Sequence, residues 1–239
     1  MTPGADARDA GGSELQRAPG GSEAERAPGA RDTILKVAAS LFSTKGYAES
    51  GLREIADQAG IRASSVYHHF ASKERIYEEI IRIAIDGIAE AIARDLRSLA
   101  PDATPRLRIE TCIAAHLRAL HANQPFTSTN AQSRIKLPAE IKLVIGPMRE
   151  RYSNFWRDLL DEAKAAGWIK PELETRMLRP LILGTLNRTV AWFDPARGPL
   201  DALSRTMITM LAGIWVNPAP GVPARKSGKP KSGAAMRQK

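Results

Sequence analysis

The sequence predicts an all-α protein: an N-terminal three-helix domain that contains a helix-turn-helix, followed by a larger helical domain. Three observations predict this fold class. Between residues 31 and 216 every strong hydrophobic periodicity has helical spacing. No segment there shows the apolar–polar alternation, bounded by turns, of a strand. Two short helical segments also flank a glycine-marked turn. We expect about nine helices.

The first predicted helices lie in residues 31–45, 51–59 and 62–69. In the first, apolar residues recur at i, i+4, i+7 and i+8, which places them on one helical face: Ile34, Ala38, Leu41 and Phe42. A basic last turn followed by Gly46 is typical of a helix end. The second helix ends at Gly60, and the third begins after a turn of only a few residues.

Six further helices account for most of the remaining sequence. Ser72 is the predicted N-cap of a long helix that runs to about residue 99, before Pro101. Pro105 occupies the first turn of the next, over residues 105–122. The others are predicted over residues 125–135, 139–166, 172–193 and 200–215.

Both ends of the chain have a composition typical of disorder. Residues 1–30 are rich in Gly, Ala, Pro and Glu, and residues 217–239 in Pro, Gly and Lys. Such segments bury too little apolar surface to offset the entropy of ordering. The predicted organisation is therefore a disordered tail (1–30), a helix-turn-helix domain (31–80), a second helical domain (81–216) and a disordered basic tail (217–239).

Composition excludes several classes of protein. No run of 18 apolar residues is present, so no membrane span is predicted, and no secretory signal is visible. The single cysteine, Cys112, excludes an internal disulfide framework and suits a reducing cytoplasm. The net charge of +9 suggests a polyanionic partner, with nucleic acid the first candidate. Residues 31–80 are nevertheless formally neutral, and the C-terminal tail carries much of the excess.

The second helix of the helix-turn-helix has the composition of a DNA-reading helix. Its polar side chains are all uncharged or basic hydrogen-bonding groups, namely Arg62, Ser64, Ser65, Tyr67, His68 and His69. A helix that enters the major groove needs short polar groups for base edges and donors for phosphates, without carboxylates. We therefore predict that this helix contacts double-stranded DNA.

Several short motifs in residues 31–81 resemble one family. They are Gly46-Tyr47, Ile55-Ala56, Ala59-Gly60-Ile61, Ser65-Val66-Tyr67-His68-His69-Phe70 and Ser72-Lys73-Glu74. Together they resemble the DNA-binding domain of the TetR family of bacterial transcription regulators. A weaker similarity, at Trp192–Pro195 and Gly198–Leu200, is to a branch that regulates steroid and fatty-acid catabolism. The resemblance implies a cytoplasmic bacterial homodimer on a palindromic operator.

The resemblance also implies roles for individual residues. Arg53 occupies a position that reads a base or a phosphate, and Ser65 and Tyr67 occupy positions that touch bases and backbone. Lys73 corresponds to a lysine that holds a phosphate at the start of the fourth helix, and His69 to a frequent phosphate donor. Two residues depart from the family pattern. Gly51 stands where Ser or Thr usually caps the second helix, and Arg62 stands where Ser often caps the reading helix.

The second domain is predicted to dimerise and to bind a ligand. In such proteins the last two helices form a four-helix bundle across a twofold axis, and the candidate interface residues are Met177, Leu181, Gly184, Leu203, Met207, Met210, Leu211 and Ile214. Candidate pocket residues are His116, Phe126, Trp156, Asn187, Arg188 and Trp192. Both sets are also compatible with the core of a monomer.

Basic residues in the second domain suggest the charge of the ligand. Those close in sequence are Arg134, Lys136, Lys142, Arg149 and Arg151. They suit an anionic effector such as an acyl-CoA thioester, or they form a solvated basic face. The resulting hypothesis is a dimeric repressor that a small molecule releases from DNA; the alternative is an architectural DNA-binding protein without an inducer. No enzyme is predicted, and no cofactor or metal, since no phosphate-binding loop or metal-ligand spacing is present.

Overall fold

The computed structural model describes residues 29–132 and 137–216. This part of the chain forms nine α-helices and three short 3₁₀ segments, in agreement with the predicted fold class. Its one β-type contact is an isolated antiparallel bridge between Ile169 and Trp215. Apart from its last two residues, the predicted N-terminal tail lies outside the described residues, as does the C-terminal tail (217–239).

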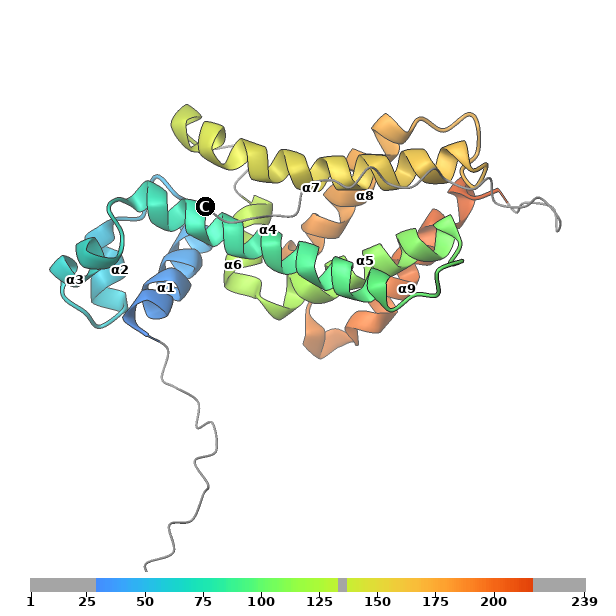
Figure 1. The fold of residues 1–239 in the computed structure, drawn as a ribbon. Helices are drawn as coiled ribbons and strands as arrows, with labels where there is room; N and C mark the ends of the chain where they lie inside the picture. Colours follow the sequence, from blue (N-terminus) through green and yellow to red (C-terminus); the bar gives the residue numbers. More distant parts are fainter. Residues whose placement is uncertain (1–28, 133–136, 217–239) are drawn as a thin grey trace, which may run out of the picture.

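The N-terminal domain is a small bundle of α1 (Ala30–Thr44), α2 (Leu52–Gln58), α3 (Ala63–His69) and the start of α4 (Lys73–Arg97). It forms one end of the molecule (Figure 1). The periodic apolar residues identified in the sequence form the core of this domain: Ile34, Ala38, Ile55 and Val66 are at most 1% exposed. Burial of this stripe fixes α2 and α3 against α1 and leaves the opposite face of α3 in solvent.

Gly60 sets the turn between α2 and α3. Its φ of +66° lies in the left-handed region, which residues other than glycine adopt only at an energetic cost. The turn directs the chain so that Ile61 N donates to Ala56 O at 3.0 Å and α3 begins almost at once.

We expect the Gly60→Ala variant to lose about 1–2 kcal/mol of folding free energy, because an L side chain is strained in this conformation. The added Cβ meets no atom within 4 Å, so the loss is conformational rather than steric. Urea unfolding measures it. Gly51→Ala is the matched control, since Gly51 has an extended φ of −111° and equally open surroundings. Equal losses in the two variants would contradict this account.

The long helix α4 connects the two domains. Its first turn is capped as predicted, since Arg75 N donates to Ser72 Oγ at 3.4 Å. Over 25 residues it leaves the N-terminal bundle and continues into the second domain, where it packs on α5 (Pro105–Ala122), α6 (Gln124–Gln132) and α7 (Ala139–Ala165). The same helix therefore belongs to both hydrophobic cores.

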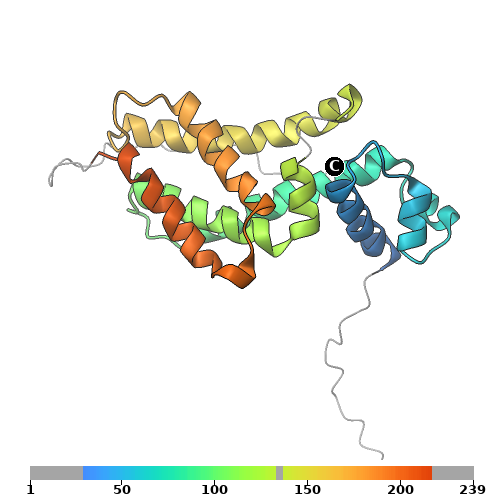
Figure 2. The same ribbon diagram turned by 180° about the vertical axis from the view of Figure 1, so that it is seen from behind.

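The second domain is completed by α8 (Thr175–Arg188) and α9 (Leu200–Met210). Figure 2 shows these two helices on the face of the molecule opposite α4 and α7. The core of the second domain is centred on four fully buried residues: Trp156, Ile113, Leu117 and Leu160. Both final helices are shorter than the predicted 172–193 and 200–215.

Specific contacts end these helices early. After α8 the chain tightens into a 3₁₀ turn at Thr189–Ala191, where the buried Thr189 hydroxyl donates to Leu186 O at 2.7 Å and pairs with the His121 ring at 2.9 Å. After α9 a 3₁₀ turn at Leu211–Ile214 brings Ile214 O within 3.0 Å of Lys170 N. These side-chain and bridge contacts cannot be inferred from the hydrophobic periodicity of the sequence.

Candidate nucleic-acid interface and effector cavity

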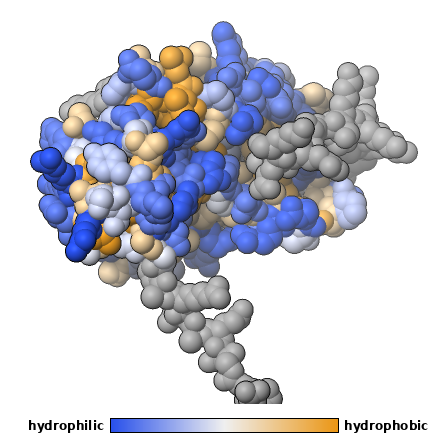
Figure 3. All heavy atoms as spheres, turned by 60° about the vertical axis from the view of Figure 1, so that its left-hand side comes forward, coloured by the Kyte–Doolittle hydropathy of each residue, from blue (hydrophilic) through white to orange (hydrophobic). Residues whose placement is uncertain are grey.

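The predicted reading helix α3 exposes its polar side chains. Arg62, Ser64, Tyr67, His68 and His69 are exposed, and Ser65 is partly exposed. Tyr67, an aromatic residue, is 58% exposed, whereas the neighbouring Val66 is fully buried. Figure 3 shows this end of the molecule as largely hydrophilic. Arg53 on α2 is also exposed, so the side chains predicted to meet DNA lie on the surface of the helix-turn-helix.

Two acidic side chains of the domain make their polar contacts with residues outside α3. Glu54 forms an ion pair with Lys45, at the end of α1. Glu74 accepts a hydrogen bond from the Tyr47 hydroxyl at 2.7 Å. Hydrogen bonds from Ser72 and Tyr47 lower the pKa of Glu74 to about 2, so it stays ionised in this contact. The negative charges of Glu54 and Glu74 are therefore engaged with residues outside α3.

Lys73 has a structural role that the sequence did not reveal. Its ammonium donates to Tyr47 O and to Ser50 O, both at 3.0 Å, and lies 4.3 Å from the centroid of the Tyr47 ring. Lys73 thereby ties the start of α4 to the loop before α2. These two hydrogen bonds use two of the three ammonium protons. The phosphate contact predicted for Lys73 remains a prediction.

We expect Lys73→Met to lose about 1–2 kcal/mol of stability, because two carbonyls lose a charged donor. Thermal unfolding measures this, with Lys142→Met, an exposed lysine on α7, as the control. If Lys73 also touches a phosphate, the slope of log affinity against log salt falls by about 1. A variant as stable as the control would contradict the structural role.

Neither short helix has a side-chain N-cap, as the two departures from the family pattern predict. Gly51 and Arg62 occupy the N-cap positions of α2 and α3 with extended backbones, and neither supplies a capping hydrogen bond. The cationic side chain of Arg62 is consequently free of the helix end and exposed beside the reading face.

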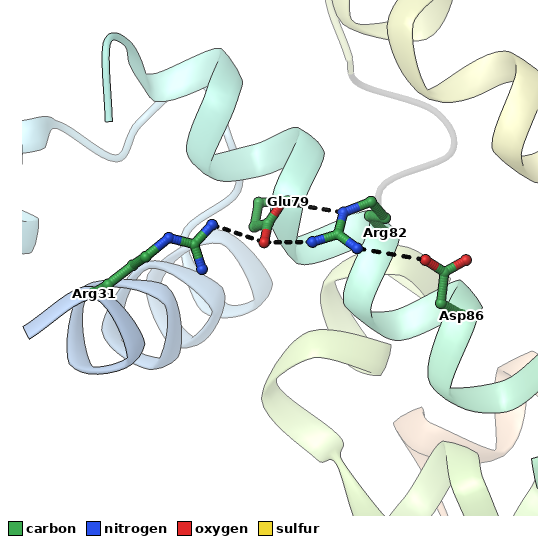
Figure 4. Close-up of polar contacts among 4 residues, drawn as sticks. All are labelled: Arg31, Glu79, Arg82 and Asp86. Atoms are coloured by element: carbon green, nitrogen blue, oxygen red, sulfur yellow. Dashed lines mark hydrogen bonds and ion pairs between the residues drawn. The ribbon is translucent and has the colours of Figure 1, made fainter. Parts of the chain in front are cut away.

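A series of ion pairs connects α1 with the middle of α4 (Figure 4). Arg31 donates to Glu79 at 2.8 Å, Arg82 donates to the same carboxylate at 2.6 and 3.1 Å, and Arg82 lies 3.7 Å from Asp86. Burial acts to raise the pKa of Glu79, but hydrogen bonds from Arg82 and Arg31 outweigh it and hold that pKa below its usual value. The series fixes α1 to α4 outside the apolar core.

The second domain contains a cavity of about 140 Å³ among α4 to α8, which reaches the surface beside the exposed residues Gly184, Arg188 and Ala191. Polar groups line one part of it. Arg149 donates to the side-chain oxygen of Asn130 at 3.0 and 3.1 Å and to its backbone oxygen at 3.2 Å. The wall from α8 contributes Asn187 and Arg188, and that from α5 contributes His116. The cavity thus combines apolar walls with amide, imidazole and guanidinium groups, as small-molecule sites do.

His116 contributes a fully buried imidazole to the cavity wall. Its Nδ1 pairs with the Tyr152 hydroxyl at 2.6 Å, and its buried Nε2 has no hydrogen-bond partner among the described residues. Burial lowers the pKa of His116 to about 4, against an opposing effect of Asn187. The ring is therefore neutral at pH 7, and its buried Nε2 is left without a hydrogen-bond partner among the described residues.

Comparison with known proteins agrees with this arrangement. Residues 34–80 match the family described as "Bacterial regulatory proteins, tetR family". Residues 102–214 match "Tetracyclin repressor-like, C-terminal domain". The chain is 31% identical over 175 residues to the HTH-type transcriptional repressor KstR2 of Mycolicibacterium smegmatis, which covers 72% of this chain and 82% of the relative. The chain belongs to the TetR family.

Other TetR-family proteins extend the comparison. The fatty acid metabolism regulator protein of Bacillus subtilis is 25% identical over 180 residues, covering 74% of this chain and 91% of that one. The structure of the ketosteroid transcriptional regulator KstR2 of Mycobacterium tuberculosis superposes with a TM-score of 0.67 at 25% identity, covering 80% and 97%. All three similar proteins are named as regulators rather than enzymes, and this TetR-family chain is a DNA-binding transcriptional regulator.

Three of the six predicted pocket residues of this TetR-family chain line the cavity: His116, Asn187 and Arg188. The other three do not line this cavity, and their contact with a ligand stays a prediction. Trp156 is fully buried in the core, Phe126 is 7% exposed in the core of the N-terminal half, and Trp192 is 60% exposed on the surface. The prediction missed Tyr152 and Asn130. Tyr152 lies four residues before Trp156, hence on the same side of α7.

The predicted interface residues of this TetR-family chain divide into two groups. Met177, Leu181 and Met210 are 55–68% exposed, and Gly184 is also exposed. By contrast Leu203, Met207 and Ile214 are at most 8% exposed, and Leu211 packs partly buried against the same core. These residues belong to the monomer core because the apolar stripe of α9 faces α5.

Two further observations concern the described part of this TetR-family chain. None of the helices in residues 29–132 and 137–216 combines the length and apolar character needed to cross a bilayer. Within the same ranges no three His, Cys, Asp or Glu side chains form a group able to hold a metal ion.

Proposed function

We propose that this protein is a homodimeric repressor that binds a palindromic operator through α3 and is released by a small anionic effector. The observation that carries the proposal is the surface of α3. Its exposed side chains are uncharged or basic, and the carboxylates Glu54 and Glu74 are engaged elsewhere in the domain. Such a helix can approach base edges and phosphates without electrostatic repulsion.

The exposed apolar residues of α8 and α9 support dimerisation. Met177, Leu181 and Met210 are large, apolar and more than half exposed on helices that share one face of the molecule (Figure 2). Exposed apolar groups gathered on one face commonly mark an interface. A second copy of the chain is the expected partner, since a twofold dimer matches a twofold-symmetric operator. Size-exclusion chromatography with light scattering tests the dimer, and Leu181→Glu is expected to dissociate it.

The cavity of the second domain supports release by a ligand. Its walls include α4, which enters the DNA-binding domain, and α8, which carries part of the proposed dimer face. A ligand bound there contacts both elements, so it can favour one arrangement of the reading helices over another. It shifts that equilibrium only by its difference in affinity for the two arrangements.

The chemistry of the cavity supports an anionic effector derived from a lipid, such as an acyl-CoA thioester. Arg149 and Arg188 provide positive charge, and leucine, isoleucine and valine side chains provide apolar surface. Two similar proteins are named for fatty acid metabolism and ketosteroid regulation. A cavity of about 140 Å³ accommodates only the acyl end of such a molecule, and the coenzyme would extend outside.

A gel-shift titration tests both parts of the proposal. The probe is the DNA upstream of the protein's own gene, with and without an acyl-CoA series. We expect binding without effector and release with it. Arg188→Met is expected to require a higher effector concentration, while Lys142→Met, on exposed α7 surface, is the control. Absence of binding to any neighbouring promoter would contradict the repressor.

The second candidate is an architectural DNA-binding protein that responds to no small molecule. It is favoured only by the small volume of the cavity. The two functions differ in the effect of metabolites on the purified protein. An effector that binds the folded state raises the melting temperature, whereas an architectural protein shows no shift with any acyl-CoA.

A further inference from the structure

The mouth of the cavity lies on the same stripe of α8 as two exposed apolar residues of the proposed dimer face. The exposed residues of the described lining are Gly184, Arg188 and Ala191, and the others are buried or partly buried. Met177 and Leu181 precede them at the same alternating steps of four and three residues. This spacing places four of the residues on one stripe of α8, with Ala191 in the turn that follows.

The mouth is also close enough to the apolar residues to be covered by the same partner. Arg188 comes seven residues after Leu181, about 10 Å along the helix. A protein interface of standard size covers about 800 Å² of each partner, a patch roughly 28 Å across. A second copy that packs on Leu181, on the face that Figure 2 shows in front, therefore extends over the mouth.

Gly184 lies between Leu181 and Arg188, in the interior of α8. Glycine destabilises a helix interior by about 1 kcal/mol relative to alanine. A Cβ at this position meets no atom within 4 Å, so packing within the described chain does not require glycine. Close approach of a second backbone does account for it, because no side chain then separates the two helices.

Arg188 brings an unpaired positive charge to this surface. Its guanidinium has no hydrogen bond or ion pair with the described residues, whereas Arg149 of the same lining is bound to Asn130. In a monomer the charge of Arg188 is solvated. Beneath a partner it loses water, and a buried ion without a counter-charge costs several kcal/mol. Because Arg188 lines the cavity, a small anion inside it can supply that counter-charge.

We propose that the cavity is a shared site: the α8 and α9 face of a second copy forms its outer wall, and an anion bound inside strengthens the dimer by neutralising Arg188. The partner closes the mouth over Gly184, so molecules exchange with the cavity only when the dimer loosens. By thermodynamic reciprocity, dimerisation strengthens anion binding by the same factor. This inference rests on the dimer and the effector cavity of the proposed function.

Thiol labelling without ligand or DNA tests the outer wall. Ser153→Cys places a thiol in the lining, whereas the native Cys112 is fully buried, and burial raises the pKa of its thiol to about 12, so it reacts slowly. We expect iodoacetamide to modify this variant about tenfold more slowly in the dimer than in a monomer produced by Leu181→Glu. Ala131→Cys repeats the measurement from α6 in case Ser153→Cys is unstable. Lys142→Cys, on exposed α7 surface, is the control and is expected to react equally fast in both states.

Sedimentation equilibrium with hexanoate tests the role of Arg188. Hexanoate is a short carboxylate, and hexanamide is its uncharged counterpart. We expect hexanoate to lower the dissociation constant of the dimer about tenfold and hexanamide to leave it unchanged. Arg188→Met is expected to dimerise about tenfold more tightly without ligand and to lose the response to hexanoate. Arg157→Met, which removes an arginine of α7 outside the lining, is the matched control.

The outcomes separate the shared site from the proposed function. Equal labelling rates in dimer and monomer, a dimer that survives Leu181→Glu, or a dimer that does not respond to hexanoate would overturn the shared site. So would a dimer weakened by Arg188→Met, the result expected if a carboxylate of the partner subunit pairs with this arginine. Neither measurement includes operator DNA, so failure of repression leaves both results standing. A chain that is monomeric at every concentration would contradict the proposed dimer and the shared site together.

Discussion

The Tyr67→Ala variant is expected to bind operator DNA about 30-fold more weakly than the unmodified chain, a loss of about 2 kcal/mol. Tyr67 is 58% exposed at the centre of α3, so nothing in the folded chain explains an aromatic residue there. Its neighbour Val66 is fully buried and anchors the helix independently. The loss therefore falls on DNA binding and not on folding.

Gel-shift titration on operator and on unrelated DNA, together with thermal unfolding, measures this. Tyr67→Phe separates the two parts of the side chain. If the hydroxyl donates to a phosphate, Phe loses affinity on both DNAs; if the ring packs on a base or sugar, Phe retains most of the operator affinity. Unchanged operator binding by the alanine variant, or a large drop in melting temperature, would contradict the predicted role.

Acidification from pH 7.5 to 4.5 is expected to remove about 2–3 kcal/mol of stability through His116 alone. Burial lowers the pKa of His116 to about 4 in the folded chain, whereas the unfolded chain has the ordinary value near 6.5. Between these values the unfolded state binds more protons than the folded state. Stability is therefore fully present above pH 6.5 and falls as the pH drops toward 4.

Urea unfolding at a series of pH values measures this slope. His116→Asn is the control, because its side-chain oxygen can replace Nδ1 as the partner of the Tyr152 hydroxyl without titrating. Burial also lowers the pKa of His121, so a smaller slope of the same sign remains in the variant. Equal slopes in the two proteins would show that His116 is not buried as described.

The fold was largely predictable because its signals are local. The stripe of Ile34, Ala38 and Phe42, the glycine at position 60 and the cap at Ser72 each act within a few residues, and each lies where the sequence predicts. The exposed face of α3 was predictable for the same reason. A short helix with few apolar residues can bury only one side.

The cavity was only partly predictable because helical periodicity does not say which neighbour covers a face. Trp156 and His116 both have the size and polarity expected of a pocket, yet only His116 borders open space. Leu203 and Met207 form the predicted apolar stripe, but α5 of the same chain covers it. Lys73 binds a loop more than twenty positions earlier in the sequence, a contact that no local pattern reveals.

The length of the 25-residue α4 determines how far a small rotation in the second domain displaces the DNA-binding domain. At 1.5 Å per residue it is about 37 Å long, and the ion pair of Arg31 with Glu79 joins its second turn to α1. A rotation of about 5° around its far end displaces its first turn by roughly 3 Å, and in a symmetric dimer the two displacements add. Reading helices that must lie about 34 Å apart to enter successive major grooves cannot tolerate such a change. An adjustment smaller than one side chain in the second domain is thus amplified, by leverage alone, into loss of register on DNA.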